Sequence, residues 1–386
     1  MLHYDKMKLV AKTFFGLENV LSGELTALGA GSVTIANRAV IFEGDIRLLY
    51  KANYMLRTAL SVLVPVKEFF IKSPDDLYRK CMQAEWDKYM NVDNSFSVSP
   101  VVHSQLFNHT GYAGLRLKDA VADYFRKSCG KRPDVNQANP DLLINLHISN
   151  DRVTVSLDSS AIPLFKRGYR QEQTEAPLNE VLAAGMLLIS GWNASTDLID
   201  PMCGSGTIPI EAALIASNTP PGKFRKYFGF QRWKGYSPEI FGEVRAEGDS
   251  GINKPNVNIS GFDISETAID RAVKNARSSG MLQNINFAVS DFRTMKSSGA
   301  GGFIIINPPY GERLQNEDTD SLYSMIGTVL KHNFIGYTVW IISSNKESIK
   351  HIGLKPKAKN TLYNGALKCV FNKYELYEGS RKIKQD

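Results

Sequence analysis

A short apolar segment that stops at two prolines constrains this 386-residue chain more than any other feature. Phe303 to Ile306 is long enough for a buried strand, and Pro308 and Pro309 cannot continue it. Because a residue before proline is held in extended geometry, Asn307 and Pro308 should form a stiff turn. In an open α/β sheet, ligands bind beyond the carboxyl ends of the strands. The segment therefore predicts a binding site at this strand end.

The turn Asn307-Pro308-Pro309-Tyr310 offers groups that fit a planar amine. The Asn307 side-chain oxygen and the Pro308 carbonyl can accept two N–H hydrogens, and the Tyr310 ring can stack on a flat base. The turn resembles the Asn/Asp-Pro-Pro-Tyr/Phe signature of methyltransferases that act on exocyclic or amide nitrogens. We predict that Asn307, Pro308 and Tyr310 are catalytic. The alternative is a rigid turn without chemistry.

A second motif lies upstream, where the apolar strand 198–200 leads into a helical pattern that starts at Ile208. Gly204 and Gly206 would let the backbone approach a ligand, and the helix start offers unpaired N–H groups. Pro209 stands where the third glycine of Gly-x-Gly-x-x-Gly would be, and no phosphate-cradling Gly-Lys-Ser/Thr follows. Residues 200–207 instead resemble the cofactor loop of class I S-adenosylmethionine (SAM) methyltransferases. An ordinary glycine turn is the alternative.

The resemblance implies SAM as cofactor. The loop would wrap the amino-acid end of SAM, with Asp200 close to its ammonium group. Asp263, which ends the strand 259–263, would hold the ribose hydroxyls, and Asp291 and Phe292 would hold the adenine. Each acid taken singly would more often be a loop or cap residue. The predicted cofactor-binding residues are Asp200, Met202, Gly204, Ser205, Gly206, Thr207, Asp263, Ile264, Asp291, Phe292 and Asn307.

An insertion at residues 218–257 separates the first two predicted strand ends. Asp200 and Asp263 lie 63 residues apart, whereas about 20 is usual in a βαβ nucleotide unit. The insertion interleaves cations with aromatic residues, which suits RNA phosphate contact and base stacking. Among its cations we predict Lys223, Arg225 and Lys226 as RNA-binding. The alternative, held equally open, is that the aromatics anchor the loop to the sheet while the cations face water.

Composition frames these motifs. The chain is 43% hydrophobic and has no apolar run near 18 residues, so we expect a soluble protein of two or three domains without membrane contact. No charged-then-apolar leader opens it, and the four cysteines lack metal-ligand spacing. These features predict a cytoplasmic protein without a metal site, and a monomer is the default expectation. Cys203, inside the loop, is interpreted as a small packing residue rather than a nucleophile.

The net charge of +7 is concentrated towards the N-terminus, where residues 1–170 carry 22 basic and 17 acidic residues. A basic segment without catalytic motifs is a candidate polyanion-binding module. Its pattern predicts a βαββαβ unit first, with strands 8–13, 32–35, 39–43 and 58–66 and helices 18–28 and 45–56. A second module follows, with helices 74–84 and 116–128 and strands 95–102, 141–149 and 152–158.

The second module resembles the THUMP domain, an RNA-binding module of RNA-modifying enzymes. The resemblance rests on residues 103–110, 115–121 and 157–170, and residues 174–180 look like the family's connection into a catalytic domain. Lys118 and Lys127, with Lys131 and Arg132 just beyond, lie on the polar side or at the end of helix 116–128 and are predicted to bind RNA. The whole pattern resembles the bacterial THUMP-containing 23S ribosomal RNA guanine-N2 methyltransferases.

That resemblance implies an α/β protein with a Rossmann-like class I methyltransferase domain, a seven-stranded mixed sheet with helices on both faces, behind α+β ferredoxin-like and THUMP modules. We expect domains at 1–65, 66–160 and 181–386, with a linker at 161–180. The chain resembles a stand-alone counterpart of the N-terminal half of the fused large-subunit enzyme. The expected substrate is large-subunit precursor RNA, and one methylation is expected because the chain ends at Asp386.

Other functions remain open. An adenine-N6 DNA methyltransferase would use the same Asn-Pro-Pro-Tyr turn, as this family has often been labelled, but would need a DNA-reading domain. A THUMP-type tRNA guanine-N2 methyltransferase and a protein-glutamine methyltransferase share parts of the pattern. A non-catalytic RNA-binding ribosome assembly factor would leave both strand-end motifs unused.

Overall fold

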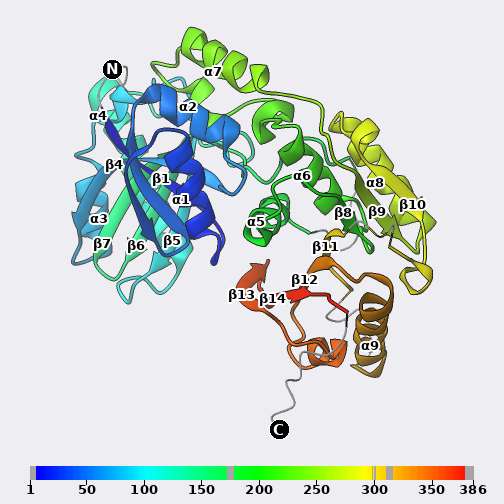
Figure 1. The fold of residues 1–386 in the computed structure, drawn as a ribbon. Coiled ribbons are helices and arrows are strands. Elements are labelled where there is room, and N and C mark those ends of the chain that lie inside the picture. Colours follow the sequence, from blue (N-terminus) through cyan, green and yellow to red (C-terminus); the bar gives the residue numbers. More distant parts are fainter. Residues whose placement is uncertain (1–5, 172–177, 298, 300, 310–315, 379–386) are drawn as a thin grey trace. The chain divides into compact units, whose positions relative to one another are not determined.

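The computed structural model describes residues 6–171, 178–297, 299, 301–309 and 316–378 (Figure 1). The chain divides into two compact units that exchange segments of sequence. The N-terminal unit comprises Met1–Thr13, Leu21–Leu164 and Arg225–Glu247. The C-terminal unit comprises Phe14–Val20, Phe165–Phe224 and Gly248–Asp386.

One seven-stranded sheet, in the order β2-β3-β1-β4-β7-β6-β5, forms the N-terminal unit. Its strands are β1 (Met7–Lys12), β2 (Gly31–Ala36), β3 (Ala39–Gly44), β4 (Ser61–Phe70), β5 (Phe96–His103), β6 (Leu142–Ser149) and β7 (Arg152–Asp158). Its helices are α1 (Glu18–Ala27), α2 (Ile46–Met55), α3 (Pro74–Cys81), α4 (Thr110–Cys129) and α7 (Pro238–Ser250), with short 3₁₀ turns η1 (Trp86–Lys88) and η3 (Gly229–Arg232). The predicted βαββαβ unit is present as β1 to β4.

Strand β4 belongs to both predicted modules. It pairs with β1 on one side and with β7 on the other, and its register shifts between Pro65 and Lys67. The expected boundary at 65/66 therefore falls at a bulge inside a continuous strand. A bulge bends a strand and increases its twist, so the two modules share one sheet that changes direction where they meet.

Helix α4 begins at Thr110, six residues before the predicted start. Gly111 and Gly114 lower the helix propensity of this first turn and a half, which misled the prediction. Gly114 is buried, and a Cβ atom there would lie 3.0 Å from Pro100 of β5. Close packing of the helix on the strand thus outweighs the propensity cost.

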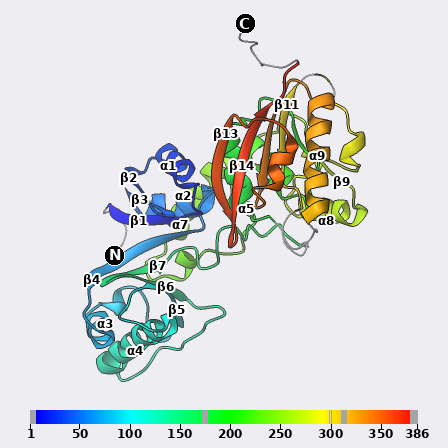
Figure 2. The same ribbon diagram turned by 90° about the horizontal axis from the view of Figure 1, so that it is seen from below.

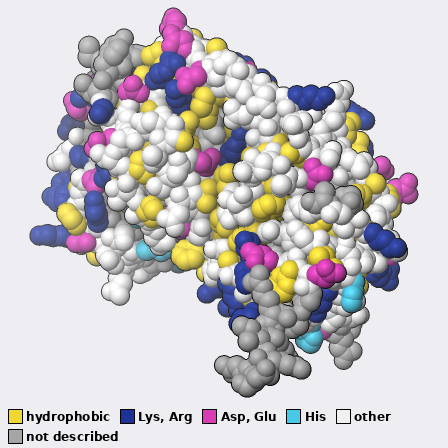
Figure 3. Space-filling view, viewed as in Figure 1, with side chains coloured by type: hydrophobic (Ala, Val, Ile, Leu, Met, Phe, Trp, Pro, Cys, Tyr) yellow, Lys and Arg dark blue, Asp and Glu magenta, His cyan; other side chains and the backbone are white. Residues whose placement is uncertain are grey.

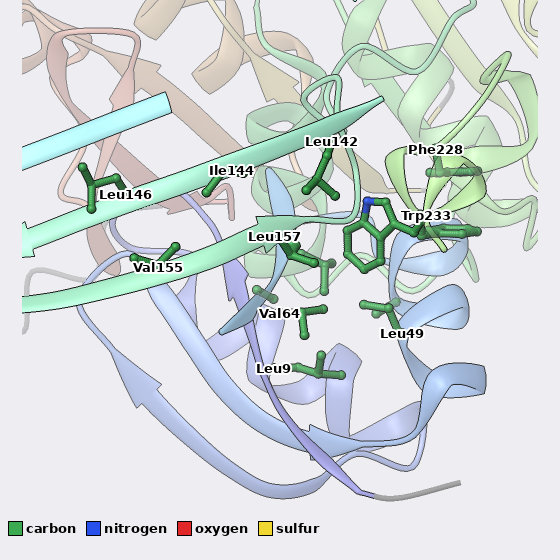
Figure 4. Packing of buried hydrophobic residues seen from close by; sticks show 14 of the residues in the cluster. Leu9, Leu49, Val64, Leu142, Ile144, Leu146, Val155, Leu157, Phe228 and Trp233 are labelled. Atoms are coloured by element: carbon green, nitrogen blue, oxygen red, sulfur yellow. The ribbon is translucent and has the colours of Figure 1, made fainter. Parts of the chain in front are cut away.

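The insertion contributes to the core of the N-terminal unit rather than to a solvent-exposed stacking surface. Figure 4 shows Phe228 and Trp233 beside Leu49, Leu142 and Leu157. Phe228, Phe230 and Trp233 are 2%, 1% and 6% exposed. Their burial corrects the interpretation that these three rings stack on RNA bases, because a ring enclosed by protein has no free face. The alternative, that the aromatics anchor the insertion, is what the structure shows for them.

A second seven-stranded sheet, in the order β10-β9-β8-β11-β12-β14-β13, forms the C-terminal unit (Figure 2). Its strands are β8 (Leu198–Asp200), β9 (Ile259–Asp263), β10 (Asn286–Val289), β11 (Gly302–Ile306), β12 (Tyr337–Ser343), β13 (Ala358–Asn364) and β14 (Leu367–Glu375). Its helices are α5 (Glu180–Ser190), α6 (Thr207–Ala216), α8 (Glu266–Ser278) and α9 (Asn316–Asn333), with 3₁₀ turns η2 (Pro221–Phe224), η4 (Leu282–Asn284), η5 (Phe292–Thr294) and η6 (Ser348–Ile352).

The strand order fixes where a ligand can bind. Strands β10, β9, β8, β11 and β12 are parallel. Strand β14 is antiparallel to both of its neighbours, β12 and β13, so β13 runs in the same direction as the parallel strands. The chain leaves β8 in one direction towards β9 and β10, and leaves β11 in the other towards β12. Right-handed crossovers then place α6 and α8 on one face and α9 on the other, with the switch point between β8 and β11. The predicted mixed sheet with helices on both faces is confirmed.

A glycine in α9 sets how closely this helix approaches η6. A Cβ atom at Gly327 would lie 2.0 Å from the backbone oxygen of Ile352. We expect Gly327→Ala to lower the free energy of unfolding by about 1–3 kcal/mol, as overpacking does in other cores. Gly242→Ala is the matched control, because this helical glycine of α7 has nothing within 4 Å of a Cβ position and alanine favours helix. The free energies of unfolding of the parent and both variants are measured in urea. A Gly327→Ala variant as stable as the parent would contradict this prediction and show that α9 can shift to accommodate the methyl group.

Candidate active site

Four polar side chains from distant parts of the sequence meet at one edge of the C-terminal sheet. Asp200 ends β8, Asp263 ends β9, Asp291 follows β10 by two residues and Asn307 directly follows β11. Because these strands are parallel neighbours in the order β10-β9-β8-β11, their carboxyl ends lie along the same edge, on both sides of the switch point. The structure thus brings together the residues that the sequence placed at separate strand ends.

The glycine loop between β8 and α6 is held from the neighbouring strand. The Asp263 carboxylate accepts a hydrogen bond from the Gly204 amide at 2.9 Å through one oxygen and one from the Ser265 amide at 2.9 Å through the other. Gly206, at φ +80°, precedes the helix, and a Cβ atom there would lie 2.9 Å from Ala272. Glycine is required at this position by both the backbone angle and the packing on α8.

Asp200, the last residue of β8 before this loop, is 1% exposed. Its carboxylate accepts a hydrogen bond from the Met202 amide at 3.2 Å. Burial, with the nearby charge of Asp263, raises the pKa of Asp200 well above its usual range. A buried carboxylate with one backbone donor is stabilised by an added cation. The site therefore fits the ammonium group expected beside Asp200.

The adenine end of the predicted site has a mixed outcome. Asp291 accepts three hydrogen bonds from the Arg293 guanidinium, which lowers the pKa of its carboxyl group. Phe292 is 4% exposed and its ring stacks on Phe334, with centroids 5.9 Å apart, so its predicted packing on adenine stays a prediction. Ile264, next to Asp263, is 65% exposed and offers an apolar surface at the same edge.

Asn307 presents a buried acceptor without a partner. Its side-chain oxygen is shielded from solvent and has no hydrogen-bond donor among the described residues. Buried polar atoms are nearly always hydrogen-bonded, so an unsatisfied amide oxygen at a strand end needs an explanation, such as a ligand. Pro308, the next residue, is buried and Pro309 is exposed. Tyr310, the third predicted catalytic residue, lies outside the described residues.

Two further groups lie at the loop: Cys203, whose burial agrees with its interpretation as a packing residue, and Arg170, which the sequence did not indicate. Cys203 is 7% exposed, and burial raises the pKa of its thiol well above the usual value, so it packs rather than reacts. Arg170, inside the stretch expected to be a linker, donates to Ser205 Oγ at 3.2 Å and to Thr207 Oγ1 at 3.0 Å. Arg170 also pairs with Glu180 at 2.8 Å, so it braces the glycine loop against α5.

The same stretch is anchored in the core by a buried network that sequence reasoning did not detect. Arg167 is 1% exposed and lies 3.5 Å from the Glu211 carboxylate, which also accepts from the Tyr169 hydroxyl at 3.0 Å. The signal available in the sequence was the composition of residues 165–170, in which two aromatic and three basic residues stand together. Such a composition is unusual for a flexible linker.

The predicted RNA-binding residues lie on exposed surface with different surroundings. Lys127 lines a pocket of about 380 Å³ together with Arg79, Met82, Gln83, Tyr124 and Ser128. Lys131 is exposed, whereas Arg132 pairs with Asp123 and Lys118 lies 3.0 Å from Asp119. An ion pair lowers the free charge that a cation offers to phosphate, so Lys127 and Lys131 are the stronger candidates.

In the insertion, the three predicted cations are also distributed unevenly. Lys226 is exposed, and Lys223 lies 2.7 Å from Asp249. The Arg225 guanidinium donates to the backbone oxygens of Ser160, Ile162 and Pro163. Arg225 thus holds the insertion to the segment that follows β7, and its prediction as an RNA contact stays untested.

Within the described residues, no helix is long and apolar enough to cross a membrane. The same part of the chain contains no group of three or more His, Cys, Asp or Glu residues arranged to hold a metal ion.

Comparison with known proteins identifies each part of the chain. Residues 167–373 match the family described as "RMKL-like, methyltransferase domain", residues 72–158 match the THUMP domain, and residues 8–63 match the "RlmL ferredoxin-like domain". A curated relative, "Ribosomal RNA large subunit methyltransferase K/L" from Syntrophotalea carbinolica, is 37% identical over 96% of this chain. The chain spans about half, 54%, of that relative's length.

Two solved structures resemble the chain over its whole length. One is described as "a possible methylase from Clostridium difficile 630", with 33% identity, a TM-score of 0.87 and coverage of 98% of this chain and 100% of that one. The other, SMU.472 complexed with SAH, has 29% identity, a TM-score of 0.88 and the same coverage. The family match over residues 167–373 and the 37% identity to the curated relative agree with the sheet order described above. The chain therefore belongs to the RMKL-like methyltransferase family, with ferredoxin-like and THUMP modules ahead of the methyltransferase domain.

Proposed function

We propose that this protein binds SAM and methylates the exocyclic N2 of a guanosine in 23S ribosomal RNA, in the large-subunit precursor. The observation that carries the proposal is the buried, unpartnered side-chain oxygen of Asn307 at the switch point of the sheet. It stands where an N–H donor of the substrate would satisfy it. A ribosomal RNA substrate also implies a cytoplasmic enzyme.

The residues at the sheet edge fit SAM by their chemistry. The buried Asp200 carboxylate suits an ammonium group, and the glycine loop between β8 and α6 leaves Gly204 open, with nothing within 4 Å of a Cβ position. Asp263 braces that loop and keeps lone pairs for ribose hydroxyls, while Ile264 is exposed beside it. SAM, when bound, supplies an electrophilic methyl group. The related structure that contains SAH supports this assignment.

The turn after β11 addresses the difficulty of methylating guanine. The exocyclic amine is conjugated with the ring, so its lone pair is a poor nucleophile. Acceptance of its two hydrogens by the Asn307 oxygen and the Pro308 carbonyl would favour tetrahedral geometry at nitrogen and restore the lone pair. Tyr310 would stack on the base and fix its plane. No general base is needed beforehand, because the proton can leave after transfer.

The N-terminal modules explain how RNA would be selected. THUMP is matched over residues 72–158, and the curated relative is a ribosomal RNA methyltransferase. We propose residues 1–65, 66–160 and 181–386 as functional domains, joined through 161–180, although the compact units follow other limits. A target base inside a helix must be flipped or already unpaired, at a cost of a few kcal/mol. DNA adenine-N6, tRNA guanine-N2 and purely structural RNA-binding functions are the alternatives that the experiments below separate.

The cofactor assignment predicts a loss of SAM affinity when Asp263 is changed. Asp263→Ala removes ribose acceptors and the brace on Gly204, and charged hydrogen bonds contribute about 1.5–3 kcal/mol each. We therefore expect SAM affinity to fall by at least tenfold in calorimetry. Asp270→Ala, which removes an exposed acid from α8, is the control and should bind SAM as the parent does. Unchanged affinity in Asp263→Ala would contradict the cofactor site.

The catalytic assignment predicts that Asn307 acts on turnover and not on cofactor binding. Asn307→Ala should lower the rate by about 10²–10³-fold, as loss of one hydrogen bond directed at a transition state does. Asn307→Asp keeps an acceptor oxygen and should retain more activity. Methyl transfer from labelled SAM is measured on 23S rRNA, tRNA, DNA and protein side by side, with the modified nucleoside identified. Methylation of DNA alone, or of nothing, would refute the proposed function.

The substrate assignment predicts a second, separable surface. Glutamine at Lys127, Lys131 and Arg132 should weaken RNA binding and flatten its salt dependence, because fewer counterions are released. SAM affinity should not change. The measured quantity is the slope of log affinity against log salt, with the triple variant Lys254→Gln, Lys274→Gln, Lys296→Gln as control. Equal slopes for all three proteins would mean that this helix surface is only solvated.

A further inference from the structure

The C-terminal unit carries a lysine-rich segment that neither the motifs nor the proposed mechanism uses. Residues 346–373 contain seven lysines and a single acid, Glu347. The N-terminal half holds most of the net charge of the whole chain, so this segment stands out within an otherwise acidic C-terminal half. Five of its lysines, which we call the lysine edge, are exposed: Lys346, Lys355, Lys357, Lys359 and Lys368.

The lysine edge lies along one border of the catalytic sheet. Strand β13 is the last strand in the order, hydrogen-bonded only to β14, and Figure 1 draws the pair at the border opposite β10. Lys357 directly precedes β13, and Lys359 lies within it. Figure 3 shows Lys and Arg side chains over the part of the molecule where Figure 1 draws these strands. Each strand residue advances about 3.3 Å, so the edge from Lys359 to Tyr363 extends about 13 Å.

Register connects this border to the candidate active site. Lys368 lies two residues before Val370, which pairs with Ser343 at the carboxyl end of β12. Lys346 follows Ser343 by three residues. Strand β12 pairs with β11 up to Ile306, the residue before Asn307. Lys346 and Lys368 therefore lie at the sheet edge that carries Asn307, and the remaining lysines continue along the border.

The charges of the lysine edge are not neutralised within the described residues. None of its five ammonium groups forms an ion pair there, whereas the neighbouring Lys350 and Lys373 pair with Glu347 at 2.6 Å and Glu375 at 3.0 Å. Exposed aromatic surface adjoins it. Tyr363 is the register partner of Lys368, and its ring contacts Phe15, 42% exposed, with centroids 5.7 Å apart. Unpaired cations beside accessible rings are the combination that binds single-stranded nucleic acid.

We propose that the lysine edge binds the phosphate backbone of the substrate RNA beside the target nucleotide, on the methyltransferase domain itself. This inference rests on the proposed function. An RNA strand carries one phosphate per nucleotide, so the five lysines of this border can meet successive phosphates of one strand. The lysine edge is then an RNA contact of the methyltransferase domain, separate from those proposed for the THUMP module.

Protection of an exposed edge strand is the other physical reason for lysines at this place, since lysine blunts edge-to-edge aggregation. The two roles differ in what they predict. Edge protection concerns self-association and is independent of RNA. Phosphate binding appears as a salt-dependent loss of RNA affinity without any change in self-association.

The test compares two triple variants that remove the same charge. Lys355→Gln, Lys357→Gln, Lys359→Gln neutralises the lysine edge, and Lys254→Gln, Lys274→Gln, Lys296→Gln neutralises exposed lysines on or near β9, α8 and η5, towards the opposite border. Affinity for protein-free 23S rRNA transcript, and for duplex DNA as a second probe, is measured from 0.05 to 0.5 M salt. Melting temperature, light scattering and SAM affinity are recorded for each protein.

The expected result is specific to the lysine edge. Three lost phosphate contacts lower the salt slope by about 2, at about 0.7 per contact for single strands, which corresponds to RNA binding about 100-fold weaker near 0.1 M salt and convergence towards 1 M. The control triple should match the parent. Equal salt slopes for the parent and both triple variants overturn this inference and leave the proposed function standing. The same holds if the lysine-edge variant aggregates but keeps the salt slope of the parent. Failure of the parent to bind RNA, or an edge-dependent slope with DNA only, overturns both.

Discussion

The burial of the insertion's aromatic rings in the N-terminal core is the interaction on which the arrangement of this chain depends. Phe228 and Phe230 stack with ring centroids 5.4 Å apart, and Phe230 stacks on Tyr50 of α2 at 4.3 Å. Arg47 and Lys51 of α2 pair with acids of α7 at the same place. The segment that does this lies between the first two strands of the methyltransferase sheet in sequence. Neither unit is therefore formed by one contiguous stretch of sequence, and deletion of residues 225–247 would remove apolar side chains from the N-terminal core.

At the candidate active site, one carboxylate links two strands. The carboxylate of Asp263, at the end of β9, accepts a hydrogen bond from the Gly204 amide in the loop after β8. The position of the glycine loop therefore depends on the neighbouring strand as well as on its own sequence. Arg170 holds the same loop from the other side through Ser205 and Thr207. A cofactor loop braced in this way loses little conformational entropy when a ligand binds, which is the physical basis of preorganisation. The unsatisfied oxygen of Asn307 is maintained against its desolvation cost by the stiff proline turn behind it.

The sequence predicted the elements that carry strong local signals. Strand ends at Asp200, Asp263 and Asn307 were recognisable because an apolar run stops at a polar residue, at glycines or at prolines. The start of α4 was placed too late because Gly111 and Gly114 weaken the helical pattern, and the close contact with Pro100 that accounts for Gly114 is a tertiary contact. The alternatives for the insertion could not be separated, since buried and base-stacking aromatics have the same sequence pattern. Arg170 was overlooked because its partners lie 8 to 37 residues away and are set by the fold.

What the sequence determined by itself was the class of fold, the family resemblance and the identity of the strand-end residues, because hydrophobic periodicity and turn chemistry are local properties. The tertiary structure decided which of those residues share an edge, because that follows from the order β10-β9-β8-β11-β12 and from parallel pairing. It also decided that Phe292 packs on Phe334, that the insertion's rings fill a distant core, and that lysines from several segments gather at the β13–β14 border of the sheet. These are long-range contacts, and no local pattern specifies the partner of a residue that is far away in sequence.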